Sequence, residues 1–305
     1  MPTSTSITTT YAGQFSGKYI AAALLAAPTL DKELVTIKPN IKYKDVIKTF
    51  SNTQLIFDAA CDFTPTSTVT LNEKILQPEE FQVNLQLCKK DFRSDWEAIE
   101  MGISVYDNLP PTFTDFLIAQ AAGQVAQALE TNIWSGSNAA SGQFAGFVNL
   151  VSGSGTGAIQ VFGAAQVSSS NVVAELQRVV DAIPNSVYGK EDLAIYVPTN
   201  VVKAYQTAVG NIGTGYLNQT VIGQKPLDFQ GIPLAFCPGM PSNTIIAAQK
   251  SNLYFGTGLL DDRNEVKILD MGDLDGSQNV RVIMRYTAAV QIGIASDIVY
   301  YGRAI

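Results

Sequence analysis

The stretch Thr112 to Trp134 constrains the fold more than any other part of the chain, because it carries the longest helical pattern. It follows Pro110-Pro111, and proline is tolerated just before a helix but not inside one. Apolar residues recur in it every four positions, at Phe113, Leu117, Ala121, Val125, Leu129 and Ile133. The helix would span about 34 Å, yet only Asp115 and Glu130 within it are charged. We therefore predict a scaffold helix that other parts of the protein largely cover.

The scarcity of charge extends to the whole chain of 305 residues, in which 46% of residues are hydrophobic and only 15% are charged. Typical proteins have about a quarter charged residues. Such a composition favours a surface that is covered by other subunits, and the alternative is a secreted protein with a neutral polar surface. The net charge of −7 gives no overall basic field for nucleic acid, although one basic face on a large assembly is compatible with it.

The three cysteines, Cys61, Cys88 and Cys237, are far apart and odd in number, which favours a reducing compartment over a disulfide framework. The apolar run after Lys18 imitates a signal peptide, but no positive residue precedes that lysine and the run is too short to span a bilayer. We expect instead a short helix from about Gly17 to Ala27, ended by Pro28. No other stretch approaches transmembrane length.

The first third of the chain reads as an arm followed by β structure. Residues 1–16 are rich in Thr and Ser without periodicity and predict an extended arm that needs a partner surface. The segment Leu34–Lys48 predicts extended chain broken at Pro39, and Thr53–Cys88 has a β pattern with turn signals that include Gln77-Pro78. This β excursion has no obvious core of its own, so it could project from the body.

After the β excursion, Asp91–Ser104 predicts a helix that precedes the long one. The Gly/Ser-rich stretch Gly136–Gly157 predicts a loop around a short strand, FVNLV. Beyond it we expect a mixed helix and strand region. Its two helices are Ser170–Ile183 and Asn200–Val209. Ser170 would cap the first helix. The buried face of that helix would consist of Val173, Leu176, Val179, Val180 and Ile183. The strands of this region are Leu193–Val197, Ile232–Phe236, Thr244–Ala248 and Asn252–Phe255, and two or three more follow in the last third, in VKILDM and VRVIMRYTAAVQIGIASDIVYY.

Candidate catalytic chemistry is sparse, because the chain contains no histidine. That excludes Ser–His–Asp and Cys–His catalysis and most catalytic zinc sites. Gly153–Ala158 resembles a dinucleotide-binding loop, but Ile159, Val161 and Phe162 predict a strand where a helix must begin, so we interpret it as a linker. Gly13–Lys18 is one residue short of a phosphate-binding loop and lacks the hydroxyl residue after lysine. We predict no catalytic, cofactor-binding or metal-binding residues.

Two charged clusters have competing interpretations. Asp270, Asp273 and Asp275 with Gly276 suggest a calcium loop, but they miss its spacing and its distal glutamate, so a solvated turn is the preferred interpretation. A cluster of lysines could contact DNA or an acidic partner, or could be an ordinary solvated segment balanced by nearby acids. Its members are Lys32, Lys38, Lys42, Lys44 and Lys48.

The order of these elements resembles that of a known family. Four runs carry the resemblance: LETNIWSG followed by GFVNL; AELQRVVDAI with DLAIYVPTNVVKAY; FQGIPLAFCPGMPSNTIIAAQKSNLYFGT; and VRVIMRYTAAVQIGIASDIVYY. Together, from about Asp91 to Tyr301, they resemble the major capsid proteins of tailed double-stranded DNA bacteriophages, which have the Hong Kong 97 type (Johnson) fold. The likeness is one of pattern and order, without a catalytic signature.

The resemblance implies an α+β fold with four parts. Residues 1–42 would form an N-terminal arm and 43–90 an extended β loop that overlaps a neighbouring subunit. Residues 91–165 and 265–305 would form a peripheral domain with a spine helix at 112–134, and 166–264 an axial domain. Many family members carry a scaffolding segment before the arm. None precedes it here, so we expect a separate scaffolding protein or none. No lysine–asparagine pair for a covalent crosslink can be identified.

The function implied is that of a non-enzymatic shell subunit in the virion, assembled in the host cytoplasm. Its partners would be copies of itself in hexamers and pentamers and packaged double-stranded DNA, with separate scaffolding, portal and decoration proteins as further candidates and no membrane. Two alternatives stay open. One is an encapsulin-type nanocompartment shell, and the other, from a different class, is a non-enzymatic binding or adhesion protein.

Overall fold

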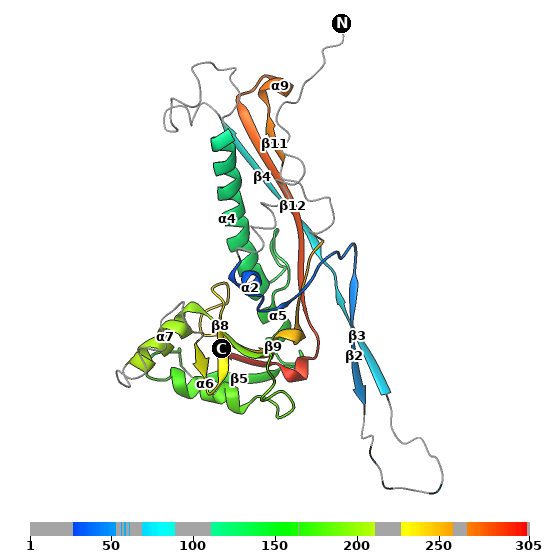
Figure 1. Ribbon diagram of the computed structural model, residues 1–305, viewed down its shortest axis with the longest axis vertical. Helices are drawn as coiled ribbons and strands as arrows, with labels where there is room; N and C mark the ends of the chain where they lie inside the picture. The colour runs from blue at the N-terminus through cyan, green and yellow to red at the C-terminus, as the bar shows by residue number, and fades with distance from the viewer. Residues whose placement is uncertain are drawn as a thin grey trace.

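The computed structural model describes residues 27–52, 56, 58, 61, 69–88, 111–163, 165–210, 227–258 and 267–303. In these residues two β-sheets form the two main bodies, and a two-stranded hairpin extends away from both of them (Figure 1). Helices cover both sheets, so the predicted mixed α+β class is confirmed.

The first sheet is organised around one long strand, β12 (Asn279–Ile292). On one side β12 pairs antiparallel with β4 (Glu79–Cys88), from Asn279 opposite Cys88 to Ala288 opposite Glu79. On its other side it pairs with β11 (Lys267–Asp270) and then with β10 (Leu253–Gly256). β1 (Thr36–Lys38) adds to β10 as a parallel edge strand. The sheet therefore joins segments from both ends of the chain.

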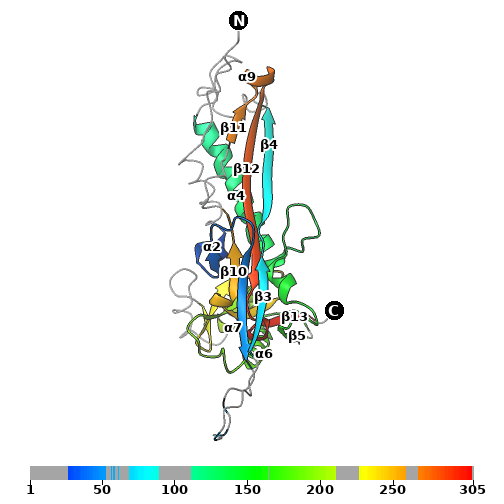
Figure 2. The ribbon, with the colours of Figure 1, turned by 90° about the vertical axis from the view of Figure 1, so that its right-hand side faces the viewer.

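The long helix α4 (Pro111–Ser135) lies along this sheet, within one residue at each end of the predicted 112–134 (Figures 1 and 2). Side chains on a strand alternate between faces, and those of β12 that are buried toward this core are Val280, Val282, Met284, Tyr286, Ala288, Val290 and Ile292. The predicted apolar stripe of α4 is confirmed at Val125, Leu129 and Ile133, which are all buried. The side chains of residues 111–122, which include the rest of the stripe, lie outside the described part.

The second sheet has six strands in the order β5-β13-β9-β6-β8-β7. Their bounds are Ile159–Gly163, Val299–Arg303, Ile245–Gln249, Leu193–Val197, Ile232–Phe236 and Asp228–Phe229. Helices α6 (Val172–Asp181) and α7 (Thr199–Gly210) pack on one face, where Ile195 and Ala247 belong to their core. The strands predicted near 193, 232, 245 and 253 are confirmed.

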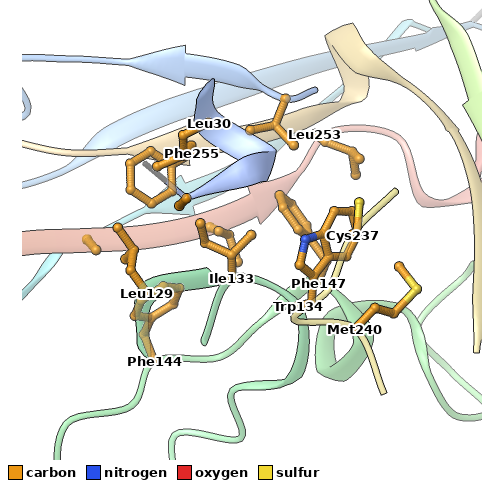
Figure 3. Packing of buried hydrophobic residues seen from close by; sticks show 14 of the residues in the cluster. Leu30, Leu129, Ile133, Trp134, Phe144, Phe147, Cys237, Met240, Leu253 and Phe255 are labelled. Carbon is orange, nitrogen blue, oxygen red and sulfur yellow. The ribbon is translucent and has the colours of Figure 1, made fainter. Parts of the chain in front are cut away.

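The other face of the second sheet shares a core with α4 and the first sheet. Tyr196 from this face lies with its ring 5.2 Å from that of Trp134 at the end of α4, and the Phe147 ring is 5.3 Å from Trp134 on another side. Figure 3 shows Leu129, Ile133 and Trp134 among side chains that include Leu253 and Phe255 of β10 and Cys237 and Met240 of the segment after β8. The end of α4 is therefore the point where the two bodies are packed together.

Two strands that the resemblance places in the peripheral domain join the second sheet. These are β5 and β13, which pair with each other, and β13 also pairs with β9. Short strands near a boundary carry no sequence signal for which sheet they join, because either pairing satisfies their backbone groups.

The predicted strand FVNLV is wrong: Phe147–Val151 is a short helix, α5. Periodicity cannot separate a helix from a strand in a short apolar run. The helical spacing places Phe147 and Val151, four residues apart, on one buried face, and α5 packs against α4. Burial of both large side chains decides the local structure.

The start of α6 also differs from the prediction. The helix begins at Val172 after Asn171, and no side chain caps it, so the predicted cap at Ser170 is wrong. The Asn171 side chain instead accepts a hydrogen bond from the Ser168 backbone N–H. Val173 was expected in the core but is exposed, because the buried positions follow the spacing that starts at Val172.

The remaining predictions concern the N-terminal part of the chain and the segment before α4, of which the structure describes only a few residues. A short helix α2 (Pro28–Asp31) starts at Pro28, where the sequence predicted that a helix ends, and proline suits a first helical position. The arm at 1–16, most of the helix at 17–27, the phosphate-loop-like 13–18 and the helix at 91–104 lie outside the described residues.

The burial of α4 predicts the effect of a charge at its centre. Leu129 is 0% exposed, so Leu129→Asp places an unpaired charge in the shared core and should reduce the free energy of unfolding by about 3 kcal/mol or more. We expect insoluble protein, or a large loss of stability in urea unfolding followed by circular dichroism. Gln124→Asp is the control, because Gln124 is exposed on the same helix. A normally stable Leu129→Asp variant would show that this stripe is not in a core.

Candidate assembly surface

Within the described part of the chain, an unusual surface lies on one face of the projecting hairpin formed by β2 (Asp45–Asn52) and β3 (Val69–Leu76) (Figure 2). Directly paired residues of antiparallel strands share a face. The register therefore places the pairs Val46–Ile75, Lys48–Glu73 and Phe50–Leu71 on one face. The four apolar members of this face are 40%, 51%, 60% and 69% exposed for Val46, Ile75, Phe50 and Leu71 respectively. We call these six residues the hairpin face.

The hairpin face has the chemistry of a protein contact. Exposed large apolar residues scattered singly are ordinary, but a contiguous group marks an interaction site. Here two apolar pairs flank one pair of opposite charges, so the face offers apolar area together with a polar centre that can fix orientation. An isolated two-stranded hairpin is also only marginally stable in water. A partner that covers this face would therefore also stabilise the hairpin itself.

The opposite face of the hairpin fastens its root to the body. Ile47 and Leu76 are buried there in a small cluster with Ala289 of β12. A Cβ on Gly256 of β10 would lie 2.8 Å from an Ile41 methyl carbon and 2.9 Å from a Leu76 methyl carbon, so these side chains would have to shift. The hairpin is thus apolar on both faces near its base, and only one of these faces is covered within the subunit.

Polar contacts fix the direction in which the hairpin leaves the body. The Lys38 ammonium donates to Asp45 at 2.6 Å and lies 5.2 Å from the centre of the Tyr254 ring. The hydrogen bond from Lys38 lowers the pKa of Asp45 below its usual range. On the other strand, the Gln291 amide donates to the Ile75 carbonyl at 2.9 Å. Both strands are therefore tied to the first sheet.

The predicted lysine cluster follows this segment and is interleaved with acids and aromatic rings. Lys38 pairs with Asp45, Lys48 lies opposite Glu73, and the Lys44 ammonium is 5.0 Å from the Tyr43 ring. Lys32 and Lys42 are exposed. This arrangement favours a solvated, charge-balanced segment over a phosphate-binding patch.

The glycine-rich and aspartate-rich stretches form turns. β5 begins at Ile159, directly after Gly153–Ala158, so a strand follows that loop where a dinucleotide-binding loop needs a helix. Asp270 and Asp275 accept hydrogen bonds from the backbone N–H groups of Gly272 and Ser277, as in ordinary turns. Among the described residues, no group of three or more His, Cys, Asp and Glu side chains could hold a metal ion.

The cysteines are free thiols in three different environments: Cys61 is exposed, Cys88 is partly buried and Cys237 is buried. Burial raises the pKa of the Cys237 thiol, which keeps it protonated and unreactive. In the described residues no helix combines the length and apolarity needed to cross a membrane.

A buried polar junction connects α2, α4 and the segment after β8. Glu130 of α4 is only 3% exposed, and its carboxylate accepts hydrogen bonds from the Thr29 backbone N–H at 3.1 Å and the Thr29 hydroxyl at 2.6 Å. The Trp134 indole N–H donates to the same hydroxyl at 2.7 Å. Gly239 also donates from its backbone, and a Cβ there would meet the Glu130 backbone at 2.2 Å. This junction fixes the position of α2 against α4.

Burial raises the pKa of Glu130, and the hydrogen bonds from Thr29, Trp134 and Gly239 oppose that rise without cancelling it. The Cys237 thiol, which is itself buried, is a titratable group close enough to Glu130 to interact with it electrostatically. The folded subunit therefore holds a proton on Glu130 at pH values where the unfolded chain has released it.

Comparisons with known proteins show the same fold in phage capsids. No protein-family model matches the sequence, and no curated protein matches it. Among solved structures, the capsid chain of an empty GTA particle aligns with a TM-score of 0.64 at 11% identity, covering 90% of this chain and 96% of that one. A chain of Gordonia phage Cozz aligns at 0.59 and 14% identity, covering 91% and 87%. The virus-like particle from Pyrococcus furiosus aligns at 0.54 and 9% identity, covering 95% and 100%.

These likenesses show the fold, which is the one expected from the resemblance in sequence. The hairpin face itself was not predicted. Its signal was present in VIKTFSN and VTLNEKIL as alternating apolar residues, but alternation does not show which of two apolar faces the body covers. Glu130 was noticed only as a rare charge on α4, and its partner Thr29 is 101 residues away.

The raised pKa of Glu130 predicts how stability depends on pH. Between the ordinary glutamate value of about 4.3 and its raised value, the folded state binds more protons than the unfolded state, so stability should fall as pH rises. Glu130→Gln should flatten this part of the curve of unfolding free energy against pH, measured by urea unfolding of the soluble subunit. Glu73→Gln, on the exposed hairpin face, should leave the slope unchanged. An equal slope in wild type and Glu130→Gln would contradict the prediction.

Proposed function

We propose that this chain is a major capsid protein: a non-enzymatic subunit that assembles as hexamers and pentamers into the icosahedral head of a tailed phage and encloses double-stranded DNA. The observation that carries the proposal is the hairpin face, an apolar contact surface held out on a fastened root by a subunit with the capsid fold. The low charge of the chain agrees with extensive contacts between copies.

The parts of the subunit take the following roles in this proposal. The hairpin is the projecting part of the extended loop at 43–90, which covers the next subunit, and the last strand of that loop, β4, returns to the first sheet. Residues 1–42 are the arm, and its strand β1 joins the same sheet. The first sheet with α4 is the peripheral domain, and α4 is its spine helix. The second sheet is the axial domain, centred on 166–264, to which β5 and β13 are added on their pairing. Scaffolding, portal and decoration proteins are further partners, and assembly takes place in the host cytoplasm before the protein becomes part of the virion.

Association through the hairpin face explains how the shell is stabilised. Fully burying a large apolar side chain contributes about 1.5–3 kcal/mol, and each face offers four such residues that are partly exposed. Stable contacts between proteins bury about 1,600 Å² in total, more than one hairpin supplies. The hairpin face is thus one of several contacts that each subunit makes with its neighbours.

An encapsulin-type shell is the second candidate. The likeness to the virus-like particle from Pyrococcus furiosus, which covers 95% of this chain, supports it. Both candidates require self-assembly and differ in what the particle contains. A binding or adhesion protein is the third candidate, and it requires neither a shell nor contact through the hairpin face.

A charge on the hairpin face should prevent assembly without unfolding the subunit. We expect expressed wild-type protein to form shells visible by negative-stain microscopy, and Phe50→Asp to raise the concentration needed for assembly at least about tenfold, because 1.4 kcal/mol of lost contact energy is tenfold in an equilibrium constant. Asn72→Asp adds the same charge on the opposite face of the hairpin and should assemble normally. A monomeric wild-type peak in size-exclusion chromatography without shells would overturn the proposal in favour of the third candidate.

The contents of the particle separate the two shell candidates. Particles released from the natural source should retain double-stranded DNA after treatment with nuclease, because a closed head protects its genome. Extraction and digestion with DNase and RNase identify the nucleic acid. Particles filled with a second protein and free of nucleic acid would support the encapsulin-type shell instead.

A further inference from the structure

The chain crosses between the two sheets at a joint made of two neighbouring segments. The first crossover is the short helix η1 (Lys250–Asn252), which leads from β9 of the second sheet to β10 of the first. The second runs through Gly293, Ile294 and η2 (Ala295–Asp297), from β12 back to β13. Leu253 pairs with Ile292, so the two crossovers leave the first sheet side by side. Figure 1 shows this joint where β12 ends near β9.

Asn252 connects the two crossovers through both ends of its side-chain amide. Its Nδ2 donates to the Ile294 carbonyl at 2.7 Å, and its Oδ1 accepts from the Ile294 N–H at 2.6 Å. Its backbone carbonyl accepts from the Gly293 N–H at 3.0 Å. The side chain thus replaces one step of a strand ladder at the place where the strands separate. Asn252 is 8% exposed, so water competes little for these bonds.

The close fit at Gly293 agrees with a fixed geometry. A Cβ at this position would lie 2.6 Å from the Asn252 side-chain oxygen, so only glycine allows the amide to reach Ile294. Rotation of one crossover against the other would break two hydrogen bonds at once and leave both polar groups of the buried Asn252 amide without their partners.

The first crossover is also fastened to the second sheet. The Lys250 N–H donates to the Asp192 carbonyl at 2.9 Å, just before β6. The Asp192 carboxylate accepts from the Ser251 hydroxyl and from the Gln249 amide. Burial acts to raise the pKa of Asp192, but these hydrogen bonds outweigh it and lower the pKa, which keeps the carboxylate ionised and bound. Asn252 therefore joins a crossover that is hydrogen-bonded to the segment before β6 to one that is held to β5 by the bond from the Ile159 N–H to the Ile298 carbonyl.

We propose that the Asn252 side chain locks the two crossovers together and so fixes the relative orientation of the two sheets. In a shell, the angle between the two bodies of each subunit determines how neighbouring subunits meet, so the same lock sets the curvature of the particle. The lock itself is a property of the subunit, and only its effect on curvature rests on the proposed function.

The test compares three full-length variants. Asn252→Ala removes both side-chain hydrogen bonds, and Asn252→Asp keeps an acceptor for the Ile294 N–H but places a carboxylate oxygen against the Ile294 carbonyl. Asn149→Ala is the control, because Asn149 is exposed and makes one long hydrogen bond of 3.4 Å to the Ser137 carbonyl. If Asn252→Ala does not fold, Asn252→Asp provides the measurement.

The first readout is hydrogen exchange of the Ile294 amide in the unassembled subunit. We expect at least a tenfold acceleration in Asn252→Ala and no change in Asn149→Ala. The second readout is the distribution of particle diameters by electron microscopy, which should broaden or shift in Asn252→Ala alone. Unchanged exchange would overturn the lock, and faster exchange with unchanged diameters would overturn its effect on curvature. Absence of wild-type particles would count against the proposed function, while the exchange measurement would still decide the lock.

Discussion

The structure depends on the way the C-terminal end of α4 is buried between two sheets. Leu129 and Ile133 face the first sheet, and Trp134 contacts Tyr196 from the second, so one helix end supplies side chains to both bodies. Such a position leaves little room for charge, and it explains why α4 carries almost none. The one acidic residue at this end of α4 is Glu130. Its carboxylate is buried and accepts two hydrogen bonds from Thr29. A buried carboxylate with a raised pKa lowers stability at neutral pH, so its role is to position α2 rather than to strengthen the core.

The hairpin shows the opposite design. Its root is buried by Ile47 and Leu76, yet the other face of the same strands leaves Phe50 and Leu71 more than half exposed. Exposing such an apolar face to water has an unfavourable free energy in a subunit that does not associate with another protein. A rigid root with an uncovered apolar end is consistent with a surface that is completed by another copy of the chain.

The sequence predicted the elements that depend on local periodicity. It did not predict the elements whose structure depends on contacts with residues far away in the chain. The bounds of α4 were predicted within one residue, because its apolar period and the prolines before it are local signals. FVNLV became a helix because Trp134 and its neighbours bury Phe147 and Val151, and no local pattern contains that information. The candidate site divides in the same way. The β excursion was expected to project, and its strand β3 does so, but its last strand β4 pairs with β12 in the first sheet. The exposed face of the hairpin follows from which face meets Ala289, more than 200 positions along the chain. The Asn252 lock depends on a partner 42 residues away and has no motif.

If copies of the chain assemble through the hairpin face as proposed, its arrangement of charge would make that contact accurate as well as favourable. An apolar stripe alone would tolerate sliding by one pair of residues, because hydrophobic attraction is not directional. Lys48 and Glu73 interrupt the stripe between Val46–Ile75 and Phe50–Leu71. A neighbour displaced along the strands would place its apolar side chains on these charges, and desolvating unpaired charges is costly. The apolar pairs would then supply the attraction, while the charged pair restricts it to one register. A shell that repeats this contact many times needs both, because an error in one contact is carried into the position of every subunit that follows.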